Sequence, residues 1–230
     1  MGHLRVRTMV LALVAVFAMS VVGTATASAK TAMPEIVNKE GKFPTKTGFT
    51  SKSGASEFET KAGHLVKCKE DSDVGKLTGA SSDESTITFT GCSTTVIVTL
   101  KCNSAGAKEG EIVLKVKSEL VWLNKTEESE PGEDLSLPSE GLTIDCTKSE
   151  TLKVKGSTVC PISGFKVKST TGTITCEQSK GVQKFTKYFL EGEKEGKTET
   201  EGSGLISFAF EPSALKSTDA LTYEESVEII

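Results

Sequence analysis

The sequence has little of several residue types on which catalysis and metal binding depend. Of its two histidines only His64 lies beyond residue 30, and no G-x-S-x-G segment occurs, so a Ser–His–acid hydrolase would lack a nucleophile elbow. No C-x-x-C pair occurs, and a single histidine cannot complete a Cys/His zinc site. We therefore expect His64 to be a surface or strand-edge residue. We also expect no catalytic residues, no metal and no cofactor.

Positive charge is sparse relative to negative charge. The 230 residues include 27 lysines and arginines against 31 acidic residues, a net charge of −4. Nucleic-acid binding depends on neutralising phosphates with Lys and Arg, so nucleic acid is not an expected partner, and anionic membrane surfaces are disfavoured for the same reason. A mean hydropathy of −0.15 excludes an integral membrane protein, and a hydrophobic share of 37% argues against a disordered chain.

The first 29 residues have the pattern of a secretory signal peptide. Arg5 and Arg7 precede an apolar run from Met9 to Met19, and Ala27-Ser28-Ala29 fits an A-x-A cleavage site. The run is too short for a membrane span, although an uncleaved anchor is the alternative. We expect a secreted, extracellular mature chain that begins at Lys30, without a membrane span.

Six cysteines lie beyond the predicted cleavage site, and an even number in an exported protein predicts a disulfide framework. A turn at 93–95 would fold the strand ending at Gly91 back along 96–100 and bring Cys92 near Cys102. A second local loop would join Cys160 to Cys176. Cys68 and Cys146 would then remain as the third pair, with Cys146–Cys160 as the main competitor.

Alternating hydrophobic and polar residues predict β-strands along most of the mature chain. Thr residues recur in these alternating runs, where β-branched side chains pack well on a pleated surface. The run 96–100 is continuously apolar and predicts a strand buried on both faces. The only helix candidates, 105–108 and 212–217, are about one turn long. The fold class is therefore all-β, an antiparallel β-sandwich or barrel stapled by disulfides. The alternating runs are 86–90, 112–117, 152–155, 173–176 and 205–210.

The domain organisation follows from three segments. Residues 1–29 are the predicted signal peptide, 30–47 show little alternation and predict an extended N-terminal arm, and 48–230 form one all-β domain. The acidic stretch 124–134 contains Pro131-Gly132, which favours a turn. We interpret it as a hairpin tip joining Leu120–Leu123 to Leu135–Leu137; a boundary between two small domains near 125–134 is the alternative.

Several short segments resemble a group of exported actinobacterial β-rich proteins of unknown function. The segments are 49–54 (FTSKSG), 89–92 (FTGC), 102–106 (CNSAG), 178–181 (QSKG) and 221–225 (LTYEE). The resemblance covers most of residues 49–229. It implies export and a disulfide-bearing β domain, and it implies no activity or ligand.

Three further patterns bear on function. The segment 70–75 (EDSDVG) could supply oxygen ligands to calcium but fails the EF-hand register, and a plain hairpin turn is the preferred interpretation. Trp122 and Tyr188-Phe189 could form sugar-binding platforms, but core packing is the preferred interpretation. Glycosidase chemistry needs two suitably separated carboxylates, and most acidic residues lie in polar contexts typical of solvated surface. The acids considered for that chemistry are Glu57, Glu59, Glu127, Glu128, Glu191, Glu224 and Glu225.

These observations favour a secreted, non-catalytic extracellular or cell-surface module that binds a partner or a glycan, with a cell-wall component among the candidates. The alternative is a secreted carboxylate-dependent hydrolase of the glycosidase type. A concave cleft that holds two close acids would favour the hydrolase, whereas a Thr-rich sheet without a cleft would favour the module.

Overall fold

The computed structural model describes residues 32–95, 98–124, 130–147, 150–190, 195–197, 201–203 and 211–230. All the regular secondary structure in this part of the chain is β-strand, which confirms the predicted all-β class. No helix within it is long and apolar enough to cross a membrane. The signal peptide predicted over 1–29 and the strand predicted over 205–210 lie outside the described residues.

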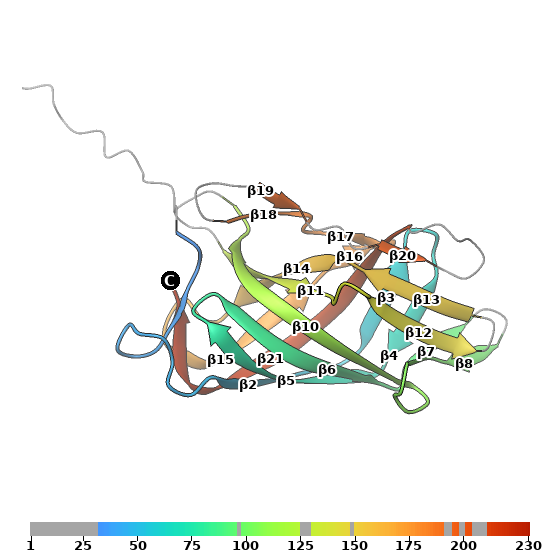
Figure 1. Ribbon diagram of the computed structural model, residues 1–230, viewed down its shortest axis with the longest axis horizontal. Helices are drawn as coiled ribbons and strands as arrows, with labels where there is room; N and C mark the ends of the chain where they lie inside the picture. The colour runs from blue at the N-terminus through green and yellow to red at the C-terminus, as the bar shows by residue number, and fades with distance from the viewer. Residues whose placement is uncertain are drawn as a thin grey trace, which may run out of the picture.

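Eight strands close into an antiparallel barrel, shown at the left of Figure 1. Each strand pairs with the next, and the last pairs back onto the first. The closure leaves none of the eight without a neighbour on either side, so inward-facing side chains are enclosed. In order around the barrel the strands are β2 (Gly48–Ser53), β5 (Glu70–Gly79), β6 (Ser82–Thr90), β10 (Glu111–Trp122), β11 (Pro131–Ser136), β14 (Ser157–Ser163), β15 (Ser169–Cys176) and β21 (Glu211–Ile229).

A second set of strands continues from the barrel through β21, which runs through both parts (Figure 1). The first residues of β21 pair with β3 on one side and β20 on the other, whereas its later residues belong to the barrel. In this set each strand pairs with the next, from β3 through to β20, and only Cys102 interrupts the series, between β8 and β9. Its other strands are β3 (Ser56–Thr60), β4 (Leu65–Cys68), β7 (Ser93–Thr95), β8 (Thr99–Lys101), β9 (Asn103–Ser104), β12 (Leu142–Thr147), β13 (Glu150–Lys155) and β20 (Glu201–Ser203).

The remaining strands are short and lie outside these two sets. In the segment predicted to be an extended arm, β1 (Ile36–Val37) pairs with the end of β21, and both of its residues are buried. The Trp122 indole donates a hydrogen bond of 2.8 Å to the backbone oxygen of Ala32. Trp122 is 4% exposed, which confirms its predicted place in the core. The remaining strands are β16 (Gln178–Ser179), β17 (Val182–Gln183), β18 (Lys187–Phe189) and β19 (Glu195–Lys197).

Two sequence predictions about elements are wrong. Residues 212–217, predicted as a helical turn, lie in β21, because pairing with β3 and burial of Ala214 and Leu215 outweigh local propensity. The run 96–100 does not form a strand buried on both faces: Val98 is 60% exposed, and β8 begins at Thr99 with an exposed residue. Residues 96 and 97 lie outside the described part of the chain.

The acidic stretch 124–134 connects a hairpin, as predicted. Trp122 lies opposite Pro131 and Lys117 opposite Ser136 in the antiparallel pair of β10 and β11. The second strand begins earlier than expected, however, and Glu133 and Asp134 are buried within it. Strands from both sides of 125–134 contribute to the barrel and to the second set.

The three disulfides are Cys68–Cys92, Cys102–Cys146 and Cys160–Cys176. Cys160–Cys176 agrees with the prediction, whereas Cys92–Cys102 and Cys68–Cys146 are wrong. The hairpin of β7 and β8 does place Cys92 beside Cys102, whose backbone N–H donates to the Cys92 carbonyl at 3.0 Å.

The correct pairing follows from the order of the strands. Cys68, Cys92, Cys102 and Cys146 form one row across four neighbouring strands. A Cys92–Cys102 bond would leave Cys68 and Cys146 three strand spacings apart, about 14 Å. That exceeds the roughly 7 Å that a disulfide can bridge. All four cysteines can therefore be paired only as Cys68 with Cys92 and Cys102 with Cys146.

Candidate functional site

Five carboxyl groups project into the interior of the barrel from four strands. Each of these residues is at most 7% exposed, and those on β5 and β21 alternate with exposed neighbours along their strands. Buried carboxyl groups of this kind are costly unless they stay protonated or find partners. The cluster comprises Asp71 and Asp73 from β5, Asp83 from β6, Glu133 from β11 and Asp219 from β21.

Serine hydroxyls and other carboxyls are the partners of this cluster. The Ser53 and Ser56 hydroxyls donate to Asp71 Oδ2 at 2.5 and 2.6 Å, and the Ser217 hydroxyl donates to Asp219 Oδ2 at 2.8 Å. Asp219 is also hydrogen-bonded to Asp71. On the opposite side Asp83 is hydrogen-bonded to Glu133. None of the salt bridges among the described residues involves a member of the cluster.

Desolvation inside the barrel is the first cause that raises the pKa of Asp73, Asp83, Glu133 and Asp219. It raises the pKa of Asp73 to about 7, with neighbouring Asp83 adding to the effect. Burial raises the pKa of Asp83 to about 6 and that of Asp219 to about 8, the latter with a further contribution from Asp71. The pKa of Glu133 is well above its ordinary range for the same reason. Asp219 and Glu133 can therefore stay protonated at neutral pH.

Four of the five carboxyl residues, all except Asp83, line an interior cavity of only about 30 Å³. Aromatic and aliphatic side chains, among them Phe49, Phe89 and Tyr223, fill the rest of the barrel around it. No group of three or more His, Cys, Asp or Glu residues in the described ranges is arranged to hold a metal ion. The cluster is thus enclosed and suited to holding protons.

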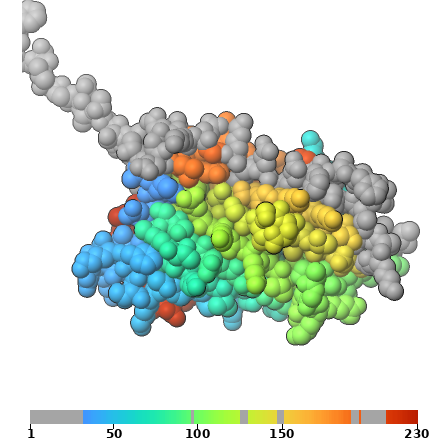
Figure 2. Space-filling view, in the orientation of Figure 1, coloured from blue at the N-terminus to red at the C-terminus, as the bar shows by residue number. Residues whose placement is uncertain are grey.

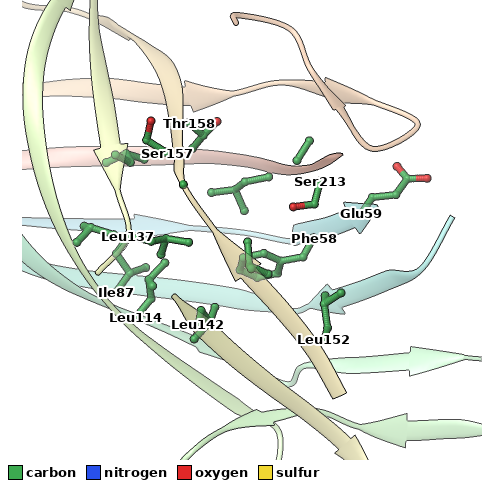
Figure 3. A pocket seen from close by; sticks show the side chains of 16 residues that line it. Phe58, Glu59, Ile87, Leu114, Leu137, Leu142, Leu152, Ser157, Thr158 and Ser213 are labelled. Carbon is green, nitrogen blue, oxygen red and sulfur yellow. The ribbon is translucent and has the colours of Figure 1, made fainter. Parts of the chain in front are cut away.

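A second cavity, which we call the junction cavity, lies where the barrel meets the second set of strands. Its volume is about 50 Å³, and its lining combines Leu114 and Ile87 from barrel strands with Phe58 from β3 and Leu152 from β13. Figure 3 shows these apolar side chains on one side and the hydroxyl-bearing residues Ser157, Thr158 and Ser213 on the other.

An open groove of about 810 Å³ crosses the outer face of the barrel. Its floor is made by β5, β6 and β10, and its wall by residues 136–140 after β11. Figure 2 shows this wall in yellow beside β10 in green. Lys115 and Lys117 are exposed in the groove and take part in no salt bridge among the described residues. Lys76 is paired with Glu84 at 3.0 Å.

The described residues that were singled out from the sequence lie at separate places in the structure and not in one site. His64 is exposed in the turn before β4, where its backbone N–H donates to Thr60 Oγ1 at 3.2 Å. This confirms its predicted place at the surface and strand edge. Glu57 pairs with Lys67 at 3.0 Å, and Glu59 accepts a hydrogen bond from Gln178 at 2.7 Å.

Of the remaining acidic candidates, only Glu224 and Glu225 lie among the described residues, and each has its own local contacts. Glu225 accepts hydrogen bonds from the backbone of residues 45 and 46, and Glu224 lies against Gly48. Glu127, Glu128 and Glu191 lie outside the described residues. Tyr188 and Phe189 form part of β18 and are partly buried, with Tyr188 hydrogen-bonded to Asp134.

The segment 70–75 is neither a calcium loop nor the hairpin turn preferred from the sequence. It begins β5, with Asp71 and Asp73 facing the barrel interior and Ser72 and Val74 facing out. Polar residues in a Gly-bounded stretch indicated a turn, but the interior here is itself polar. The period-2 spacing of the two aspartates was the only available signal of a strand.

No protein-family model, curated protein or solved structure matches the chain. The candidate sites therefore rest on their own geometry and chemistry.

Proposed function

We propose that the mature chain is a secreted, non-catalytic binding module whose groove binds an acidic polysaccharide. The observation that carries this proposal is the pair of exposed lysines, Lys115 and Lys117, on the floor of an 810 Å³ groove; neither forms a salt bridge with any residue that the structure describes. They are two positions apart on β10, so both point outward on the same face. Within a chain of net charge −4, this groove contains three lysines and two glutamates.

The rest of the lining supports a sugar polymer as the occupant. Thr86, Ser136 and Ser139 bring hydroxyl groups to the groove, which can exchange hydrogen bonds with sugar hydroxyls. No aromatic side chain lines it, so stacking on a sugar face is not available and charge has to supply much of the affinity. Anionic groups spaced along a polymer suit this arrangement.

The carboxyl cluster argues against the alternative, a carboxylate-dependent hydrolase. Glycosidases hold their two carboxyl groups about 5 to 9.5 Å apart on either side of an accessible bond. Here Asp83 and Glu133 are hydrogen-bonded to each other, and each is 7% exposed. A sugar ring cannot pass between them without opening the barrel.

We expect the purified mature chain to bind polygalacturonate and not neutral dextran, with affinity that falls as salt is added. The double variant Lys115→Glu/Lys117→Glu should weaken binding at least about tenfold, since each reversal replaces an attraction by a repulsion. Titration calorimetry or surface plasmon resonance at low ionic strength measures the change.

A matched control carries the same change of charge elsewhere. Lys61→Glu/Lys153→Glu alters two exposed lysines outside the groove and should leave binding unchanged. Equal loss in both double variants, or no binding to any acidic polysaccharide, would refute the proposal. Release of reducing sugar that Asp73→Asn abolishes would instead support the hydrolase.

A further inference from the structure

Two hydroxyl groups in the junction cavity have no hydrogen-bond partner. Thr158 and Ser213 are 8% and 7% exposed, and neither Thr158 Oγ1 nor Ser213 Oγ has a hydrogen-bond partner among the described residues. Leaving a buried hydroxyl unsatisfied is unfavourable, and folded proteins do so rarely. Both residues line the cavity, and in Figure 3 the Ser213 hydroxyl points toward the apolar side chains across from it.

Strand alternation places both residues on inward faces of their strands. Thr158 lies on the same face of β14 as Cys160, which is fully buried in the core. Ser213 lies on the same face of β21 as Leu215, another core residue. The positions of the two residues are therefore fixed by strands and not by loops.

Size and charge limit what the cavity can hold. Its volume of about 50 Å³ exceeds the roughly 10–15 Å³ that one water needs, yet it is smaller than cavities that bind benzene. Among the described residues Glu59 is the only titratable one in the lining, and its carboxylate accepts a hydrogen bond from Gln178 at 2.7 Å. No lysine lines the cavity, so an anion would find no cation there.

We propose that the junction cavity binds a small uncharged molecule of a few carbon atoms with one hydrogen-bonding oxygen, of the alcohol or ketone class. Its oxygen satisfies the Ser213 or Thr158 hydroxyl, and its carbon atoms contact the apolar wall of Leu and Phe side chains. This division of a lining into apolar walls and a few placed polar groups is typical of small-molecule sites.

The groove on the barrel surface lies next to the junction cavity. Val116 and Leu137 line both the groove and the junction cavity, so a single layer of side chains separates the two. Leu137 follows the end of β11 and is only partly buried. A rotamer change at Leu137 is the smallest motion that would connect them. The cavity site does not depend on polysaccharide binding in the groove.

Propan-2-ol and xenon test the site separately. Propan-2-ol tests for the hydroxyl partners, and xenon tests for the apolar volume alone. We expect both to bind the mature chain, with amide chemical-shift changes confined to residues around the cavity. Thr158→Val/Ser213→Ala should weaken propan-2-ol binding about tenfold, the loss of one buried hydrogen bond, and leave xenon binding intact.

Retained xenon binding shows that the double variant is folded with its cavity preserved. Thr218→Val/Ser179→Ala, which changes two exposed hydroxyl residues, is the matched control and should bind both probes like the parent chain. Equal propan-2-ol binding by the parent and the cavity variant overturns the proposal. Failure of propan-2-ol to bind the parent chain, as would follow if the hydroxyls hold only resident water, overturns it too.

Discussion

The temperature of thermal unfolding is expected to fall by roughly 10 °C as the pH rises from about 5 to about 9. The cause is the carboxyl cluster inside the barrel, where desolvation raises the pKa of Asp73 to about 7 and that of Asp219 to about 8. An unfolded chain would release these protons near pH 4. Differential scanning calorimetry across this range measures the effect.

The sign follows from which state holds more protons. Between about pH 4 and pH 8 the folded chain keeps protons that the unfolded chain has lost, so stability declines as pH rises through the folded pKa values. For Asp73 alone, raising the pKa from 3.8 to about 7 lowers the free energy of unfolding above pH 7 by about 4 kcal/mol relative to its value near pH 4. The trend reverses at lower pH, because the ion pair with Lys67 lowers the pKa of Glu57 and is lost on acidification.

Asp73→Asn isolates one member of the cluster. The variant keeps the shape of the side chain but cannot ionise, so its unfolding temperature should depend less on pH between about 5 and 8. Glu70→Gln removes an acid from the outer face of the same strand and should leave that dependence unchanged. A flat profile in the parent chain, or identical slopes in the parent and Asp73→Asn, would show that the cluster does not control stability.

Removing the Cys102–Cys146 disulfide is expected to have the largest effect of the three cysteine pairs. The two cysteines are 44 positions apart, and closing that loop in the unfolded chain contributes about 4 kcal/mol on the chain-entropy model. Cys102→Ala/Cys146→Ala should therefore lower the free energy of unfolding by about that amount. Urea unfolding monitored by circular dichroism provides the measurement.

The Cys160–Cys176 pair is a suitable comparison, because its loop spans only 16 positions and its removal deletes the same number of sulfur atoms. Cys160→Ala/Cys176→Ala should cost about 1 kcal/mol less. Peptide mapping without reduction should yield Cys68–Cys92 and Cys102–Cys146 fragments. A Cys92–Cys102 fragment, or a reversed order of stabilities, would contradict the assignment.

The sequence sufficed for the strands whose burial alternates. Thr86–Thr90, Ile112–Lys117 and Thr173–Cys176 all lie in strands, because one face of each packs inward and the other meets solvent. The pairing of β10 with β11 was also predictable, since apolar strand residues resume on each side of the acidic stretch 124–134. Local pattern is enough wherever the two faces of a strand differ in polarity.

The carboxyl cluster could not be found in this way. Asp71 and Asp73 alternate like core residues, but they are acidic, so the pattern indicated exposure and a turn. Only barrel closure brings them to the same enclosed volume as Glu133 and Asp219, which are distant in sequence. Side-chain polarity predicts burial only while the interior is apolar.

The sequence by itself determined the all-β class and the surface position of His64, and it favoured the pairing of Cys160 with Cys176 over Cys146 with Cys160. Tertiary structure alone decided the other two disulfides, because their partners depend on which strands become neighbours across the second set. It also decided the junction cavity, whose hydroxyls at Thr158 and Ser213 come from strands that are far apart in sequence. Spacing along the chain specifies local contacts. Contacts between distant strands depend on the order in which the strands pair within the barrel and within the second set.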